Sequence, residues 1–382
     1  MVTLTDIRLC CGCTACQAVC PREAISLVPD ALGFKYPKVD MDRCTDCGLC
    51  EKVCAFVRPL PELQLPVAKA ARNKDEQSLM RSRSGAVFPV LAEHILSDGG
   101  AVYGAVMDEK FRVLHKRAVT LEEADLFRGS KYTQSDMGNV YKAVLDDLKK
   151  GITVLFSGTP CQVHGLSSYV PSILREKLIL ADVVCHGVPS PYVWRDYILY
   201  QERLRKGKVV EANFRDKNEY GWKEHRETYR VGDKLYTDMS YTYLFYKHIM
   251  LRPSCTICPY ADIKRVSDIT LGDFWGWQNA VPGFNDDDKG VSLVLLNTEK
   301  GRHLFSKCES QLFTRDVQLS DCLQPNLQHP TKPHHDTDAF TRDFTEKGLT
   351  YVMKRYGDKG WRYMVYSTYM NIKRTVKKWL KR

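Results

Sequence analysis

Long apolar runs are the first thing this chain lacks. The longest apolar strings, such as Ile152 to Phe156, are far shorter than the roughly 20 residues that a membrane-spanning helix needs. The first ten residues also lack a basic segment followed by an apolar run. We therefore expect neither a secretory signal nor a transmembrane span.

Over most of its length the chain also lacks an excess of charge of either sign. The formal net charge is +10, but residues 341–382 alone hold 12 Lys/Arg against 3 Asp/Glu, so the rest is almost neutral. A nucleic-acid-binding protein needs a basic surface on its main body. No nucleic-acid partner is expected.

Cysteine, by contrast, is abundant, with 15 residues in 382. Without an expected secretory signal, so many cysteines indicate metal ligands rather than a disulfide scaffold, because the cytoplasm keeps thiols reduced. We therefore expect a cytoplasmic metalloprotein.

Two cysteine runs near the amino terminus repeat one pattern about 34 residues apart: Cys10-x2-Cys13-x2-Cys16-x3-Cys20-Pro21 and Cys44-x2-Cys47-x2-Cys50-x3-Cys54. This spacing is typical of bacterial ferredoxins with two 4Fe–4S clusters, in which the fourth cysteine of each run binds the other cluster. Zinc is the alternative, but zinc sites do not require four cysteines in this order. The prediction is a first cluster on Cys10, Cys13, Cys16 and Cys54, and a second on Cys20, Cys44, Cys47 and Cys50.

Four further cysteines predict a third centre. Cys255 and Cys258 form a C-x2-C pair, while Cys161 and Cys185 each follow a short apolar strand. We predict a third 4Fe–4S cluster on these four thiols. The alternative is that Cys161 and Cys185 are small buried residues. The remaining cysteines are interpreted as structural: Cys11, Cys308 and Cys322.

The fold class expected is α+β and α/β. Residues 1–58 form a small ferredoxin-like domain with two clusters, and the Pro-rich residues 59–69 form a linker. Residues 70–330 form a mixed α/β domain with parallel strands, divided into 70–150 and 151–330, because two strand–loop–helix units follow one another. Residues 331–382 form a basic tail that includes an amphipathic helix at 363–382.

A series of short motifs in the body supports a family resemblance: Ser82-Arg83-Ser84-Gly85, Gly129-Ser130-Lys131-Tyr132-Thr133-Gln134-Ser135, Ser157-Gly158-Thr159-Pro160-Cys161-Gln162, Cys185-His186-Gly187-Val188-Pro189-Ser190-Pro191, Phe214-Arg215-Asp216-Lys217, Cys255-x2-Cys258 and Ser267-Asp268-Ile269-Thr270-Leu271-Gly272-Asp273-Phe274-Trp275-Gly276. With these motifs, residues 1 to about 300 resemble the family of coenzyme F-420 hydrogenase/dehydrogenase beta subunits. The resemblance implies a flavoprotein that holds FAD beside at least one 4Fe–4S cluster. Members of the family that use coenzyme F-420 pass a hydride between it and the flavin, which makes F-420 a candidate substrate. Similar bacterial proteins, whose hosts are not known to make F-420, include some that lie near glycan-modifying pyruvyl transferases.

The resemblance implies a set of FAD-binding residues within these motifs: Ser84, Gly85, Lys131, Tyr132, Gln134, Ser135, Gly158, Thr159, Asp268, Gly272, Asp273 and Phe274. Some have independent support from their chemistry. Gly158-Thr159, between a strand and a helix, offers N–H groups to a pyrophosphate, and Lys131 offers a positive charge. Ordinary turns, a capping Asp and a core aromatic ring are the alternatives for single residues.

Other motifs carry less information. His186, next to Cys185, is a weak proton-donor candidate, and no catalytic acid or base is assigned. Asp286-Asp287-Asp288 lacks calcium-loop spacing and is interpreted as a solvated turn. The basic helix at 363–382 is expected to dock on the body or a partner; alternatively, it makes a peripheral contact with the inner membrane surface.

The resulting prediction is an iron–sulfur flavoprotein oxidoreductase. It would pass electrons between a hydride-carrying small molecule at FAD, such as coenzyme F-420, and a one-electron carrier through 4Fe–4S clusters. Its partner would be an electron-carrier protein or another oxidoreductase subunit. The alternative is an electron-transfer adaptor subunit without a substrate site, serving for example a pyruvyl modification system of glycans.

Overall fold

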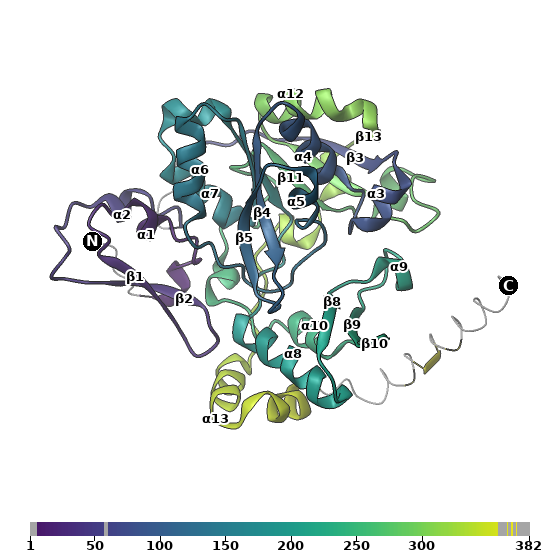
Figure 1. Cartoon of the computed structure of the whole chain (residues 1–382). Coiled ribbons are helices and arrows are strands. Elements are labelled where there is room, and N and C mark those ends of the chain that lie inside the picture. Colours follow the sequence, from purple (N-terminus) through teal and green to yellow (C-terminus); the bar gives the residue numbers. More distant parts are fainter. Residues whose placement is uncertain (1–5, 57–59, 358–364, 366–367, 370–371, 373–382) are drawn as a thin grey trace.

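The computed structural model describes residues 6–56, 60–357, 365, 368–369 and 372. Most of the predicted basic helix at 363–382 lies outside these residues. Figure 1 shows an amino-terminal region on one side of a larger body. In the body, a large sheet lies above a smaller group of strands and helices.

The amino-terminal region contains one hairpin, β1 (Ile25–Pro29) and β2 (Lys35–Val39), and two short helices, α1 (Ala15–Val19) and α2 (Leu49–Lys52). The internal repeat of the sequence is also a repeat of the backbone. Gly12 and Asp46, 34 residues apart, have φ of 72° and 48°, and Thr14 and Gly48 have φ of 70° and 73°. Both cysteine runs therefore fold into the same left-handed loop before a helix.

The body is built on an eight-stranded mixed sheet of order β13-β3-β12-β11-β7-β6-β4-β5. The four strands β4, β6, β7 and β11 are parallel to their neighbours in this group, which confirms the predicted parallel strands. The strand bounds are β3 (Val67–Asn73), β4 (Ala101–Met107), β5 (Val113–Ala118), β6 (Val154–Gly158), β7 (Leu178–Val183), β11 (Ile269–Asp273), β12 (Ser292–Leu296) and β13 (Leu312–Val317).

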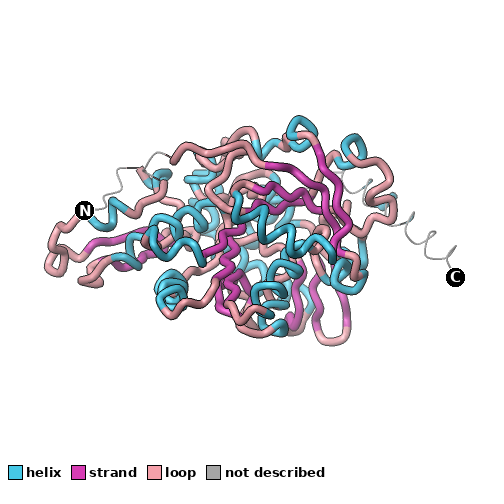
Figure 2. The backbone as a smooth tube through the Cα atoms, turned by 90° about the horizontal axis from the view of Figure 1, so that it is seen from above, coloured by secondary structure: helices cyan, strands magenta, loops and turns pink. Residues whose placement is uncertain are grey.

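Helices cover both faces of this sheet (Figure 2). Strand β6 shows why: Val154 and Phe156 pack on the side of α6 and α7, while Leu155 points to the side of α4 and α12. Because alternate side chains of a strand point to opposite faces, all three are buried. The helices around the sheet are α3 (Glu76–Arg81), α4 (Val87–Ser97), α5 (Leu121–Asp125), α6 (Val140–Lys149), α7 (Pro160–Tyr169), α11 (Trp277–Ala280) and α12 (Glu299–Cys308).

The lower part of the body in Figure 1 has its own aromatic core. Trp194, Tyr197 and Tyr229 pack between α8 and a three-stranded antiparallel sheet. Its elements are α8 (Pro191–Arg205), β8 (Val209–Asn213), α9 (Lys217–Tyr220), β9 (Glu227–Val231), β10 (Lys234–Asp238), α10 (Ser240–Tyr246) and α13 (Thr337–Tyr356).

Helix α13 belongs to residues 331–382, which the sequence assigned to a basic tail. Phe340 and Val352 of α13 are completely buried in the aromatic core, so this part of the tail packs as body structure. Short 3-10 turns complete the chain at Ile7–Leu9 (η1), Ser172–Lys177 (η2), Pro253–Ile257 (η3), Glu309–Gln311 (η4), Leu319–Cys322 (η5) and Pro325–Leu327 (η6). Within the described residues, no helix combines the length and apolar character needed to cross a membrane.

Candidate metal centres and cofactor site

The two amino-terminal cysteine runs line two separate hollows. One hollow is lined by Cys10, Cys13, Cys16 and Cys54. The other is lined by Cys20, Cys44, Cys47 and Cys50. The fourth cysteine of each run thus lies with the first three of the other run, which is the crossed arrangement of a ferredoxin with two clusters.

The spread of the thiols in each hollow fits a cubane better than a single ion. One zinc ion with Zn–S bonds of about 2.3 Å would hold its sulfurs roughly 3.8 Å apart. Among the described residues, three metal-binding atoms lie within 4.8 Å of one another only at His334, His335 and Asp336, and at no group of cysteines. In a cubane the ligands are further apart, because each thiolate binds a different iron.

Burial and the neighbouring cysteines also raise the pKa of one thiol in the first hollow. Burial, followed by the charges of Cys10 and Cys54, raises the pKa of Cys16 to about 12. The Cys16 thiol therefore stays protonated at pH 7 unless a metal binds it, so metal binding would release a proton here.

The third set converges at the carboxyl ends of β6 and β7, where loops of parallel strands meet. Cys161 lies in the first turn of α7, Cys185 follows β7, and Cys255 and Cys258 lie on and just after η3. The N–H of Val188 donates to Cys255 Sγ at 3.4 Å, which joins the loop of Cys185 to the C-x2-C pair. Burial, then the charge of Cys161, raises the pKa of Cys185 to about 12.

The third set adjoins the first hollow. Cys11 also lines the first hollow, and its thiol lies close enough to the thiol of Cys161 to raise the pKa of Cys161. Helix α7 approaches the first cysteine run so closely that a Cβ on Gly165 would lie 2.8 Å from Cys13 Sγ. Cys11, interpreted from the sequence as structural, is therefore the thiol that lies between the two predicted centres.

Some of the predicted FAD-binding residues lie in a buried charged group. Arg215 donates to Asp273 at 2.6 Å and to the Tyr132 hydroxyl at 3.3 Å. Trp222 donates to the other Asp273 oxygen at 2.8 Å and stacks on Trp275, whose ring is 42% exposed. Burial opposes ionisation of Asp273, but the charges of Arg215 and Arg83 lower its pKa.

Two arginines of this group leave polar atoms without partners. The Nε atoms of Arg83 and Arg215 are buried and have no hydrogen-bond partner in the described part of the chain. Nearby, Lys217 donates to the carbonyls of Ser84 and Lys289, and burial lowers its pKa to about 7. Sequence reasoning missed these three cations as site residues, although each lies in a motif that supported the family resemblance.

A second part of the predicted set lies beside the cysteines. Gln134 donates to the Cys11 carbonyl at 3.0 Å. Ser135 accepts from Gln162, whose side chain also completes the capping box of Thr159 at the start of α7. Gly158 ends β6 immediately before this cap. Residues 131–135 link the two groups, because only Thr133 separates Tyr132 from Gln134.

Lys131 is turned toward its own loop. Its ammonium donates to the carbonyls of Leu126 and Arg128, at 3.1 and 2.7 Å. Burial lowers the pKa of Lys131 to about 7.

The other predicted FAD-binding residues have internal packing roles. Asp268 accepts from the Leu180 N–H and the Thr298 hydroxyl just before β11, at the opposite end of that strand from Asp273. The remaining contacts are equally internal: Ser84 donates to the Val291 carbonyl, Cβ atoms added to Gly85 and Gly272 would meet Ala71 and Val184, and Phe274 is wholly buried. The structure does not bring these residues to the charged group as ligand-facing side chains.

His186 faces another histidine. Its Nε2 lies 2.7 Å from Nε2 of His248, whose Nδ1 lies 3.1 Å from the Lys332 carbonyl. Since a carbonyl only accepts, Nδ1 of neutral His248 carries the proton and His186 donates to Nε2. Burial, then the charge of His248, lowers the pKa of His186 to about 4, so it is neutral at pH 7.

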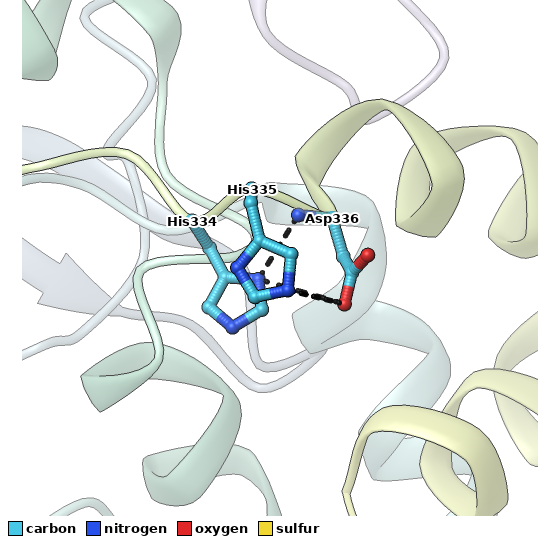
Figure 3. Close-up of side chains that lie close together, drawn as sticks. All are labelled: His334, His335 and Asp336. Atoms are coloured by element: carbon cyan, nitrogen blue, oxygen red, sulfur yellow. Dashed lines mark hydrogen bonds and ion pairs between the residues drawn. The ribbon is translucent and has the colours of Figure 1, made fainter.

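Two polar clusters lie apart from the cysteines. Figure 3 shows His334, His335 and Asp336, where the Asp336 N–H donates to His334 Nδ1 at 3.1 Å and His335 lies 3.3 Å from the Asp336 carboxylate. In the Asp286–Asp288 turn, Asp287 pairs with Arg72 at 2.7 Å. The first cluster caps the start of α13, and the second ties a loop to β3.

A repeated cysteine fold with crossed hollows, joined to an α/β body, defines an iron–sulfur protein of the electron-transfer class. Residues 9–56 match the model of the 4Fe-4S dicluster domain. Residues 152–318 match the model for the C terminus of the beta subunit of coenzyme F420 hydrogenase/dehydrogenase. The chain thus carries a dicluster domain followed by the carboxyl-terminal domain of the beta-subunit family that its motifs resemble.

Individual relatives cover parts of the chain. An F(420)H(2) dehydrogenase subunit of Methanosarcina mazei is 24% identical over 184 residues, which are 45% of this chain and 51% of that protein, so about half of the relative is matched. One subunit of the Na(+)-translocating ferredoxin:NAD(+) oxidoreductase complex from Acetobacterium woodii is 38% identical over 74 residues, 19% of this chain and 21% of that one. A chain of the F420-reducing [NiFe] hydrogenase complex from Methanosarcina barkeri aligns with a TM-score of 0.48 at 17% identity, covering 78% of this chain and 95% of its own.

Proposed function

We propose that the protein is an iron–sulfur flavoprotein oxidoreductase that passes electrons between a hydride carrier and a one-electron carrier. Three 4Fe–4S clusters would be held by the cysteine sets predicted from the sequence, with FAD in the body. The observation that carries the proposal is the close approach of α7, which bears Cys161, to the first hollow: a Cβ on Gly165 would lie 2.8 Å from Cys13 Sγ. Electrons entering the body would then have a short route to the amino-terminal region.

When bound, FAD would take up two electrons as a pair and pass them on one at a time. Arg83 and Arg215 could bind its phosphates, because their Nε atoms are buried without partners. Thr159 at the start of α7 is a second phosphate candidate, since a helix amino terminus favours anions. The segment that contains Tyr132 and Gln134 runs between the two candidate phosphate sites: Tyr132 contacts Arg215, and Gln134 lies beside the cysteines.

The hydride carrier proposed is coenzyme F-420 or a molecule of the same class. This rests on the family, in which the matched relative from Methanosarcina mazei is named as part of an F(420)H(2) dehydrogenase. The relatives are named as subunits of complexes, which supports a partner oxidoreductase subunit or an electron-carrier protein. A cytoplasmic location, with peripheral membrane contact through the basic segment at 363–382 as an addition, belongs to the same proposal.

An adaptor subunit with clusters but no flavin is the second candidate. It is favoured by the internal contacts of Asp268, Gly272 and Phe274, which leave fewer residues to face a flavin.

Cofactor extraction after anaerobic purification separates the two functions. We expect about one FAD per chain, bleached by reduced F-420, NADH or NADPH in anaerobic titrations. Arg215→Gln should lose most of the FAD and keep its iron, whereas Arg230→Gln, at an exposed ion pair on β9, should keep both. Iron without flavin in the unmodified protein would establish the adaptor.

A further inference from the structure

Arg252 is a completely buried arginine at the junction of the two regions. Its Nε donates to the Cys10 carbonyl at 2.8 Å, and its Nη1 donates to Gln134 Oε1 at 2.9 Å. Its Nη2 donates to the Lys35 carbonyl at 2.9 Å and lies 3.5 Å from Cys10 Sγ. All three guanidinium nitrogens are therefore directed at the amino-terminal region or at the residue that contacts it.

No carboxylate forms an ion pair with Arg252 in the described part of the chain. Its recorded partners are carbonyls, an amide, one thiol and the ring of Tyr36 at 4.4 Å. Burying a positive charge without an anion costs several kcal/mol as a rule. The nearest group able to carry a negative charge among these partners is the sulfur of Cys10, a predicted ligand of the first cluster.

The main chain of Arg252 belongs to the other centre. Its N–H donates to the Val188 carbonyl, and its carbonyl accepts from the Cys255 N–H, both at 3.0 Å. Val188 in turn donates to Cys255 Sγ. One residue thus has its backbone in the third cysteine set and its side chain on the first.

The first cysteine run is shaped around this side chain. A Cβ added to Gly12 would lie 2.8 Å from Arg252 Nη1 and from Gln134 Nε2, and Gly12 has a φ of +72°. A larger residue would therefore both strain the loop and push the guanidinium away.

We propose that Arg252 is a positioning residue that holds the first cluster against the third and raises the reduction potential of the first cluster. This rests on the proposed function, because it requires clusters on both cysteine sets. A fixed positive charge beside a ligand favours the reduced cluster, which carries one more negative charge. The same contacts keep Cys11 against Cys161.

The test is an EPR-monitored redox titration of the anaerobic protein and its Arg252→Gln and Arg252→Lys variants. In Arg252→Gln we expect the potential of one cluster to fall by about 59 mV, which corresponds to a tenfold change in its one-electron equilibrium. The other cluster signals should keep their potentials. Arg252→Lys preserves the positive charge, so its cluster potential should return most of the way to that of the unmodified protein. The single ammonium of lysine cannot reproduce all the hydrogen bonds of the guanidinium.

Arg230→Gln is the control, because it also removes one positive charge, but from β9, where Arg230 forms an exposed ion pair with Glu211. Its potentials should equal those of the unmodified protein. Equal potentials in Arg252→Gln and the unmodified protein, or equal shifts in Arg252→Gln and Arg230→Gln, would overturn the proposal. If Arg252→Gln fails to assemble clusters, Arg252→Lys decides: clusters within about half of the 59 mV shift of the original potential support the role of the charge, and lost clusters or a larger shift refute it.

If the proposed function itself is wrong, the result is different. Unmodified protein without iron and acid-labile sulfide would refute the presence of the clusters, whatever the results with the Arg252 variants. Clusters whose potentials do not change in the Arg252 variants would refute only the positioning role of Arg252.

Discussion

The amino-terminal region and the body are stabilised in different ways. The body buries four apolar clusters against its two sheets, with large side chains such as Phe156 and Trp194 at their centres. Between residues 6 and 56, the large buried side chains Leu32, Phe34 and Val53 pack into cores of the body, while Ile25 lines the second hollow. The body can therefore fold by packing alone, whereas the smaller region depends on metal and on docking.

Loss of a cluster ligand should give the largest difference between the two regions. Cys44→Ala removes a predicted ligand of the second hollow, whose lining includes only a few apolar side chains such as Ile25, Val39 and Leu49. We expect about four fewer iron atoms per chain and rapid proteolysis within residues 20–54, while the body stays resistant. Iron analysis and limited proteolysis with mass spectrometry measure both effects.

Cys308→Ala is the control for that experiment, because Cys308 is buried in the body and is interpreted as structural. It should retain its iron and the original cleavage pattern. Equal protease resistance of Cys44→Ala and the unmodified protein would contradict the metal dependence of the smaller region.

A cavity in the body should have the opposite effects, because it should lower the stability of the body without any loss of iron. Leu155 is fully buried on β6, so Leu155→Ala should lower the free energy of unfolding by about 2–5 kcal/mol without loss of iron. Urea unfolding followed by tryptophan fluorescence measures this change. Val183→Ala on the neighbouring strand, where Val183 is 38% exposed, should change it by less than about 1 kcal/mol. Iron loss in Leu155→Ala would show that the two regions are not separable.

A buried carboxyl group should add a pH-dependent loss of stability to the body. Burial, then the charge of Asp238, raises the pKa of Glu227 to about 7. Because the folded pKa lies above the unfolded value, this contribution to stability is complete below about pH 4.5 and is lost as the pH rises through 7. Glu227→Gln should remove a fall on the order of 3 kcal/mol between pH 5 and 8.

Denaturant unfolding at several pH values measures this slope, and Glu211→Gln on the exposed side of β8 is its control. The slope should persist in Glu211→Gln. If it persists equally in Glu227→Gln, another group is responsible.

The exposed ion pair between the regions should matter least. Lys35 and Asp136 are 2.6 Å apart, but their side chains are 42% and 37% exposed. Lys35→Gln should therefore cost about 1 kcal/mol or less in urea unfolding. A loss as large as that of Leu155→Ala would mean that docking depends on this pair.

Cysteine spacing predicted how the cysteines group in the two crossed hollows, and the order of strand, loop and helix predicted the parallel strands, because both depend on local order along the chain. Helix α10 ends at Tyr246, and His248 adopts a φ of 60° beyond it. The contact of His248 with His186 could not be predicted from helical periodicity, because only the tertiary fold brings together two residues 62 positions apart in the chain.

The site was less predictable than the fold. Gln134 was predicted to bind a cofactor from its motif, but its amide lies between Cys11 and Arg252, two residues from opposite parts of the chain. Arg252 itself stands three residues before a C-x2-C pair and belongs to no motif. Its role depends on the approach of the two regions, which only the tertiary structure shows.

Metal and sulfide analysis of protein purified without oxygen tests the central claim most directly. The three cysteine sets predict about twelve iron atoms and an equal amount of acid-labile sulfide per chain. Zinc in place of iron, with no labile sulfide, would contradict the account of an electron-transfer protein.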